Sequence, residues 1–226
     1  MVNPVASGRS NAARNRLKFE HRLVLVNWMI DLFGVATFED LAKHIRTPEF
    51  EGFTEEGISR FHQCLRLVIN RPELPHDILL AYDENIVRHW KKITEKRNVE
   101  GKNLYPKYFQ YICLLFTEIY LDRYFRDPHK LLTDLNQLAE QFNAAQTPQQ
   151  HALGRLFATG LPEEMRVKPY TAEDLRKLAF WSATGSGKTL LMHINILQYR
   201  HYLNLHGQER ELNRIILLTP NDGLSR

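Results

Sequence analysis

The stretch over residues 178–189 most constrains how this chain can fold, because it reads LAFWSATGSGKT: an apolar run, a glycine-rich turn and the start of a helix. Gly185 and Gly187 allow backbone N–H groups to converge on phosphate oxygens, and the helix that starts at Lys188 adds the positive end of its dipole. Lys188 is placed to reach the β- and γ-phosphates, and Thr189 to bind the Mg²⁺ that bridges them. The stretch therefore predicts a phosphate-binding loop for a nucleoside triphosphate with its metal.

The pattern GxxxxGK(S/T) has glycine at its first position, where this chain has Ser182. That position closes the turn from the strand into the loop, whereas the closest approach to phosphate falls on Gly185 and Gly187, so we expect serine to be tolerated. A plain glycine turn is the alternative. We assign Lys188 and Thr189 as catalytic residues and Thr189 as the Mg²⁺ ligand. The expected nucleotide-binding residues are Ser182, Ala183, Thr184, Gly185, Ser186, Gly187, Lys188 and Thr189.

The composition is that of a globular protein, because 226 residues with 43% hydrophobic side chains are enough for a core in one or two domains. No apolar run approaches the length of a membrane span, and the N-terminus has no signal-peptide core, so we expect no membrane partner and a cytoplasmic location. Cys64 and Cys113 lie in apolar helical patterns without CxxC spacing, which predicts buried, reduced thiols.

The net charge of +4, from 30 basic against 26 acidic residues, is a weak indication of a polyanionic partner. The basic excess is concentrated at the start of the chain, in Arg9, Arg14, Arg16, Lys18 and Arg22. We expect a flexible basic N-terminus over residues 1–15, for which a solvated tail is favoured over an arm that contacts phosphates.

Apolar side chains recur at intervals of three and four residues before the loop, and predict a helical accessory domain over residues 16–146. Gly34 should end the first helix and Thr37 should cap the second. These two helices resemble half of a helix-turn-helix, a pairing that is common in any small bundle. The expected helices cover residues 17–33, 38–45, one that opens at Thr54 and ends before Pro72, 76–97, 105–125 and 129–144.

Residues 147–174 change in composition and predict a connector, in which residues 149–157 could form a short helix. Beyond it we expect a strand over 178–182, a helix over 187–206 and a second strand over 214–219. This order is a βαβ unit, whose strands should be parallel and whose crossover should be right-handed.

Two segments of this second half resemble a known family. The run 183–190, ATGSGKTL, resembles motif I of superfamily 2 helicases and translocases, particularly the DEAD/DEAH-type proteins related to the Res subunit of type III restriction enzymes. The segment 215–225, IILLTPNDGLS, is similar to their motif Ia in sequence and position. The resemblance covers roughly residues 175–226. It implies a mainly α N-terminal domain followed by the start of an α/β RecA-like P-loop domain with an incomplete parallel sheet.

The resemblance also implies ligands and partners. ATP and Mg²⁺ would be the cofactors, DNA the nucleic-acid partner, and a methyltransferase or specificity subunit a further partner, in a role related to restriction or phage defence. The motif Ia loop, with Thr219, Pro220 and Asn221, would contact a nucleic-acid strand. An upstream glutamine often binds the adenine in this family. The candidates here are Gln110 and Gln149 or Gln150, for which a packing or surface role is the alternative.

Triphosphate hydrolysis needs an acidic residue at the end of another strand, and the acids after Thr189 are Glu209, Glu211 and Asp222. None of them ends an apolar strand in the manner of a DEAD/DEAH box. We therefore expect the N-terminal part of a longer motor, which by itself turns over little or no nucleotide. Two other functions stay open: a helical module that docks a partner or DNA, and a P-loop ATPase without a nucleic-acid substrate.

Overall fold

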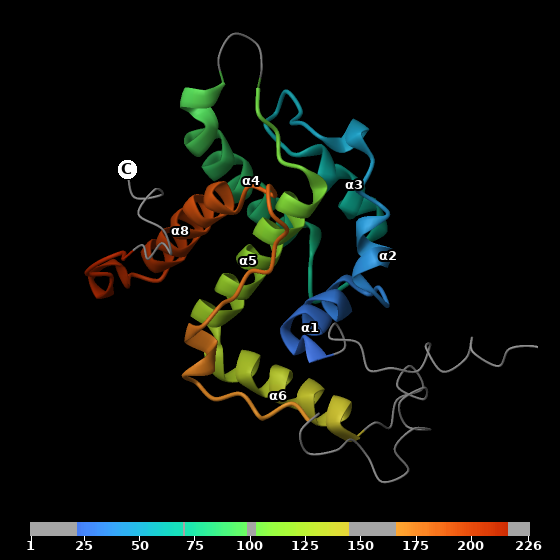
Figure 1. Ribbon diagram of the computed structural model, residues 1–226, viewed down its shortest axis with the longest axis vertical. Helices are drawn as coiled ribbons and strands as arrows, with labels where there is room; N and C mark the ends of the chain where they lie inside the picture. The colour runs from blue at the N-terminus through green and yellow to red at the C-terminus, as the bar shows by residue number, and fades with distance from the viewer. Residues whose placement is uncertain (1–21, 70, 99–102, 145–165, 217–226) are drawn as a thin grey trace, which may run out of the picture.

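The computed structural model describes residues 22–69, 71–98, 103–144 and 166–216. In these ranges the chain forms seven α-helices and no strand, and its only β-pairing is two isolated bridges. The helices are α1 (Val24–Phe33), α2 (Phe38–Ala42), α3 (Arg60–Val68), α4 (His76–Thr94), α5 (Tyr108–Arg126), α6 (Pro128–Ala144) and α8 (Lys188–Leu205), as Figure 1 shows.

Local capping sets most of the helix ends as the sequence predicts. Gly34 ends α1 in the left-handed conformation, and the Thr37 hydroxyl caps α2 by accepting from Asp40 N–H. The helix expected from Thr54 begins later, at Arg60, because Ser59 is its cap. The Thr54 hydroxyl instead accepts from Ile58 N–H in the preceding turn.

The centre of the fold is α5, which packs against α4, α6 and α8. Tyr111 near its start is fully buried and donates from its hydroxyl to Asp83 of α4 at 2.6 Å. The same carboxylate accepts from the backbone N–H and the hydroxyl of Ser59 at 2.8 and 2.6 Å. Because buried polar groups need partners, these bonds fix α3, α4 and α5 in one arrangement.

The expected parallel sheet is wrong for the described residues. Residues 177–183 contain no strand, and neither do residues 214–216, the part of the second expected strand that the structure describes. A strand needs a neighbour that accepts and donates its ladder of hydrogen bonds, and neither segment forms a β-ladder or bridge with another described segment. Trp181 and Ile216 are accordingly 91% and 75% exposed. No RecA-like sheet is present in these ranges.

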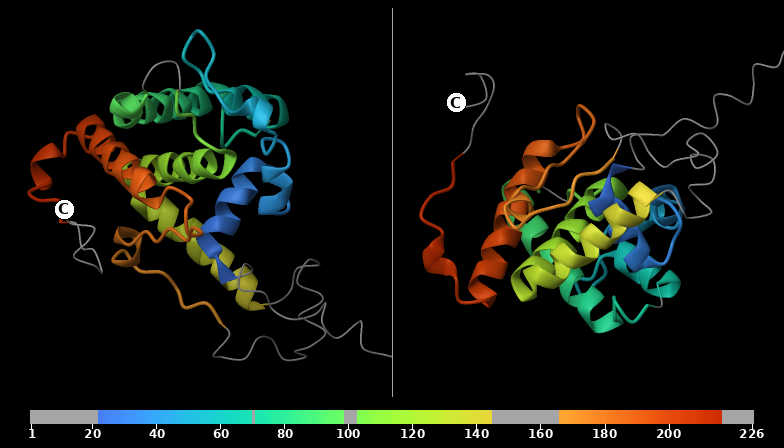
Figure 2. Two further views of the ribbon diagram at one scale, coloured as in Figure 1. Left: turned by 45° about the horizontal axis from the view of Figure 1, so that its top comes forward. Right: turned by 90° about the horizontal axis from the view of Figure 1, so that it is seen from below.

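The chain approaches the glycine-rich loop along α6, as Figure 2 shows in two views. The Asn136 side chain bonds both the N–H and the carbonyl of Tyr170, at 2.7 and 3.0 Å. Asn143 bonds the N–H and the carbonyl of Val167 in the same way, at 2.8 Å each. Each side-chain amide thus satisfies both backbone groups of one residue in the extended segment, as a strand partner would.

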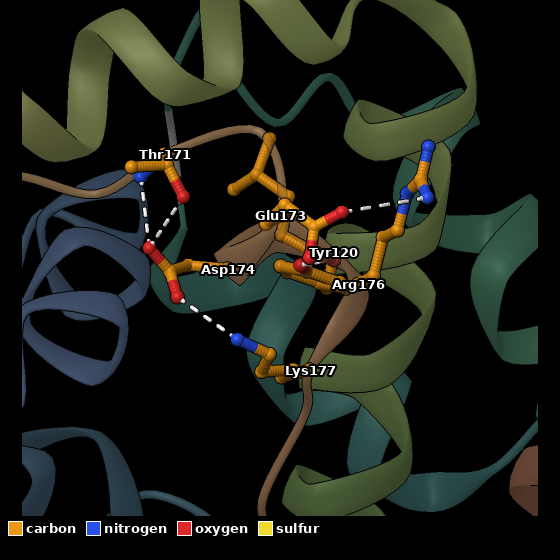
Figure 3. Close-up of polar contacts among 7 residues, drawn as sticks. Tyr120, Thr171, Glu173, Asp174, Arg176 and Lys177 are labelled. Carbon is orange, nitrogen blue, oxygen red and sulfur yellow. Dashed lines mark hydrogen bonds and ion pairs between the residues drawn. The ribbon is translucent and has the colours of Figure 1, made fainter.

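A short 3₁₀ helix, η7 (Asp174–Arg176), follows this extended segment and anchors the chain before it reaches the loop. Figure 3 shows Asp174 accepting from the Thr171 N–H and hydroxyl at 3.0 and 2.7 Å and pairing with Lys177 at 3.3 Å. Leu175 is buried, and its carbonyl accepts from the Tyr120 hydroxyl of α5 at 2.5 Å. The residues after η7 therefore start from a point anchored on α5.

Helix α8 closes the fold by packing on α4 and α5. It spans nearly the predicted range, and Leu191, Ile194 and Tyr202 join the same core as the N-terminal helices. None of the described helices is long and apolar enough to cross a membrane.

Several sequence predictions are settled only in part. Cys64 and Cys113 are free but partly rather than fully buried. The basic tail over 1–15 and the short helix expected over 149–157 lie outside the described residues, and the division into domains stays a prediction.

Candidate functional site

The glycine-rich loop forms a tight turn that leads directly into α8. Ser186 N–H donates to the Ala183 carbonyl at 3.2 Å, and Gly185 and Gly187 have φ angles of 79° and 85°. Only glycine adopts this left-handed region without strain, so the two glycines are required by the backbone itself. The turn and the helix start predicted from the sequence are both confirmed, although residues 177–183 before them form no strand.

The start of α8 presents unsatisfied donors to the loop. The first N–H groups of a helix have no intrahelical acceptors, and Gly187 provides no side-chain cap for α8. The aligned peptide dipoles of an 18-residue helix add positive potential at this end. Beside it, the Ser186 hydroxyl is buried without a hydrogen-bond partner in the described part of the chain. A hydroxyl and a row of N–H groups of this kind suit the oxygens of a phosphate.

Lys188 supplies the charge of the site. Its Nζ donates to the carbonyl oxygens of Ser182 and Ala183 at 3.2 and 3.3 Å, so the ammonium lies across the loop. The side chain is exposed, and neutral carbonyls are weaker partners for an ammonium than phosphate oxygens. An anion at the loop could therefore draw Nζ to itself without breaking a buried ion pair.

Thr189 stands in the first turn of α8 with an exposed side chain, which leaves its hydroxyl open to a metal or to solvent. In the described ranges, no group of three or more His, Cys, Asp or Glu side chains could hold a metal ion. Glu209 lines a second hollow together with Arg200 and Asn204, toward the far end of α8 from Thr189. Asp222 lies outside the described residues. A Mg²⁺ ion here would depend on Thr189, the phosphates and water.

Gln110 reaches the loop from the start of α5. Its Nε2 donates to the Ser186 carbonyl at 2.9 Å, and its Oε1 accepts from Lys107 N–H at 2.9 Å. A Cβ on Gly187 would lie 2.7 Å from this Nε2, so the side chain also fills the space that glycine leaves. Both polar atoms of Gln110 are engaged within the protein, at the loop backbone and the helix cap. The competing candidates Gln149 and Gln150 lie outside the described residues.

A hollow of about 630 Å³ adjoins the loop on the exposed side of α8. Its walls are mainly apolar, with Lys188 and Thr189 at one end and Arg214 on the returning segment. Asn195 also lines it, and its Oδ1 is buried without a partner among the described residues. The motif Ia residues Thr219, Pro220 and Asn221 fall outside the described ranges, so their position relative to the hollow stays a prediction.

No family model, no curated protein and no solved structure matches this chain. The likeness of residues 183–190 and 215–225 to helicase motifs therefore depends on those residues alone. The loop geometry is independent of that likeness, because it follows from the positions of Gly185, Gly187 and Lys188.

Sequence reasoning did not find the contacts that hold α8 in place. Glu118 of α5 accepts from Asn85, Gln198 and Tyr202, although it occupies one of the most apolar segments of the chain. The two acids within this segment, Glu118 and Asp122, were the available signal. Gln110 was selected from the sequence, but as a nucleobase contact rather than as a contact of the loop backbone.

Proposed function

We propose that the chain binds ATP with Mg²⁺ through residues 182–189 and forms the nucleotide-binding part of a DNA helicase or translocase. The observation that carries the nucleotide part is that three donors lie at one turn. They are the Lys188 ammonium, the Ser186 hydroxyl, which has no partner among the described residues, and the N-terminus of α8, which has no side-chain cap. Bound Mg²⁺ would add positive charge that neutralises the phosphates, and the Thr189 hydroxyl is the side chain that would hold it.

The nucleic-acid part of the proposal is supported by the resemblance of residues 183–190 and 215–225 to motifs I and Ia. DNA is the substrate that the family likeness favours. Movement along DNA would need an acidic residue and further catalytic groups, and the described residues contain no group of three or more His, Cys, Asp or Glu side chains that could hold a metal ion. We therefore assign binding, rather than rapid hydrolysis, to this chain by itself.

Nucleotide titration tests the proposal. Binding of a fluorescent ATP analogue with Mg²⁺ should weaken at least tenfold in Lys188→Ala, because a charged hydrogen bond contributes about 1.5–3 kcal/mol. Lys92→Ala is the matched control, since it removes the same charge from an exposed position on α4. Equal affinity of the wild type and Lys188→Ala would refute the assigned loop.

Anisotropy titrations against duplex and single-stranded DNA, at two salt concentrations with and without ATP, test the second part. The helicase proposal expects DNA binding whose affinity changes with nucleotide. An affinity for DNA that does not change with nucleotide would favour the helical docking module. Nucleotide binding without any DNA binding would favour a P-loop ATPase with another substrate.

A further inference from the structure

A buried polar cluster joins α8 to the rest of the fold, far from the loop itself. Glu118 of α5 is 0% exposed and accepts three hydrogen bonds. Asn85 Nδ2 of α4 donates to Oε1 at 2.6 Å, Gln198 Nε2 of α8 donates to the same oxygen at 2.7 Å, and the Tyr202 hydroxyl of α8 donates to Oε2 at 2.8 Å. We call these four residues the Glu118 node.

The node is the polar part of the α8 docking surface. Two of its three donors lie on α8, and Gln198 Nε2 also donates to the Leu114 carbonyl of α5 at 3.0 Å. Next to it, the ring of Tyr202 stacks on Phe125 with centroids 6.2 Å apart. These contacts link residues about 80 positions apart in the sequence, so they form only when α8 lies in its place.

Because α8 starts at the phosphate loop, the node also affects the loop. The helix is continuous from Lys188 through Gln198 and Tyr202, and a helix moves as a stiff rod over a few turns. A shift of α8 on α5 would displace its first turn from Gln110, which holds the Ser186 carbonyl. The position of the loop therefore depends on the node as well as on Gln110.

A carboxyl group in this place is costly to ionise. Burial raises the pKa of Glu118 to about 7, although the three donors and the Arg88 guanidinium act in the opposite direction. Arg88 donates to Asn85 Oδ1, which connects its charge to the node. The titratable or charged groups that face Glu118 are Arg88 of α4, Tyr202 of α8 and Tyr111 of α5, with Tyr82 and Asp122 beyond Tyr202.

The node can satisfy Glu118 in either charge state. The ionised carboxylate has the three donors described above. The neutral acid has one O–H to donate, and Gln198 Oε1 is a buried acceptor without a partner among the described residues. Rotation of the Gln198 amide or of the Tyr202 hydroxyl would supply that acceptor. Proton uptake therefore removes a buried charge, and the neutral acid keeps an acceptor for its proton at the cost of a hydrogen bond that Gln198 or Tyr202 now donates.

We propose that Glu118 is a positioning residue for the phosphate loop, and that its charge state sets how firmly α8 is held on α5. The docking part depends on the geometry of the node, and the effect on nucleotide binding rests on the proposed function. The docked protein holds the proton more tightly than a protein in which α8 has detached and Glu118 meets water. Docking is therefore firmest at low pH and weakens as the pH rises toward 7.

Hydrogen exchange of the full chain, read by mass spectrometry between pH 6 and pH 8 and corrected for intrinsic exchange rates, tests the docking. The frequency of α8 opening in the wild type, divided by that in Glu118→Gln, should rise roughly tenfold over this range, because the exposed carboxyl is ionised throughout while the buried one titrates near 7. Glu118→Gln should lack this rise. Glu140→Gln, the same change at an exposed position of α6, should keep the wild-type response.

Two neighbouring imidazoles act on docking in the opposite direction. Burial and Arg88 lower the pKa of His89 to about 4, and the same causes lower the pKa of His201, so these rings make docking firmer as the pH rises. Tyr202→Phe supplies a second variant that leaves the carboxyl in place. It removes a donor to the ionised form, so the midpoint of the wild-type transition should move to higher pH. An unchanged pH response in both Glu118→Gln and Tyr202→Phe would overturn the inference.

Titration of the same variants with the fluorescent ATP analogue and Mg²⁺ tests the link to the loop. The nucleotide itself titrates in this pH range and affects both proteins equally, so the two are compared at each pH. The affinity of the wild type divided by that of Glu118→Gln should fall several-fold between pH 6 and pH 8. A constant ratio alongside pH-dependent exchange would overturn the link. If no form binds nucleotide at any pH, the proposed function fails, and the exchange result by itself decides whether Glu118 controls docking.

Discussion

Gln110 Nε2 donates to the carbonyl oxygen of Ser186 at 2.9 Å, which joins the start of α5 to the phosphate loop across 76 residues of sequence. The side chain is 9% exposed, and its Oε1 caps α5 by accepting from Lys107 N–H. One amide thus serves a helix end and the loop together. The helical bundle, rather than a sheet, positions the loop in the described part of the chain.

Gln110→Glu separates the two roles. The new carboxylate keeps an acceptor for Lys107 N–H but has no donor for the Ser186 carbonyl, so the cap should persist while the loop contact is lost. Affinity for the fluorescent ATP analogue should fall about tenfold, which combines a lost hydrogen bond with a negative charge beside an anion site. Gln110→Met, which adds no charge, measures the part due to the lost bonds. Wild-type affinity in both variants would contradict a role for Gln110 in shaping the loop.

Gly187→Ala should destabilise the loop more than Gly185→Ala. Both substitutions place a side chain at positive φ, which costs about 1–2 kcal/mol. A Cβ at Gly187 would in addition lie 2.7 Å from Gln110 Nε2, whereas one at Gly185 meets nothing within 4 Å. Urea unfolding should show a larger loss of stability in Gly187→Ala than in Gly185→Ala. The double variant Gly187→Ala with Gln110→Ala should recover part of this extra loss. Equal loss in the two single variants would show that backbone strain alone decides the effect.

Asn143→Ala should loosen the segment that leads to the loop. The substitution removes both hydrogen bonds to Val167 and should lower the free energy of unfolding by about 1–3 kcal/mol. Asn136→Ala should act similarly through Tyr170. The exposed Asn204 of α8, changed to alanine, is the control. Limited proteolysis near residues 166–170 should become faster in the first two variants only.

Glu118 should contribute stability that is lost as the pH rises toward 7, and Glu118→Gln should lack that component. The folded-state pKa of about 7 exceeds the ordinary value of 4.5, so the stabilisation from the bound proton is complete below about pH 4.5 and lost above about pH 7. The corresponding change is about 3 kcal/mol. Urea unfolding at pH 5 and pH 8, taken as the difference between wild type and Glu118→Gln, measures it. A pH-independent difference would mean that Glu118 is not the group responsible.

The helices were predictable because their signals are local. Gly34 and Thr37 act on backbone groups within four residues, and the sequence alone identifies such caps. The loop was predictable for the same reason, since Gly185 and Gly187 set their own backbone angles. The start of α3 was misjudged because Thr54 and Ser59 are both suitable caps, and the bond between Ser59 and Asp83 of α4 favours the second.

The sequence by itself determined a glycine turn followed by a helix that begins at Lys188, because backbone sterics and helix capping depend on near neighbours. Only the tertiary structure decided that the apolar run before the turn forms no strand, since a strand exists only with a partner to pair with. The tertiary structure also decided that Gln110 and Glu118 hold the loop and its helix. Their partners lie 76 to 84 residues away, and no local pattern specifies which distant groups will meet.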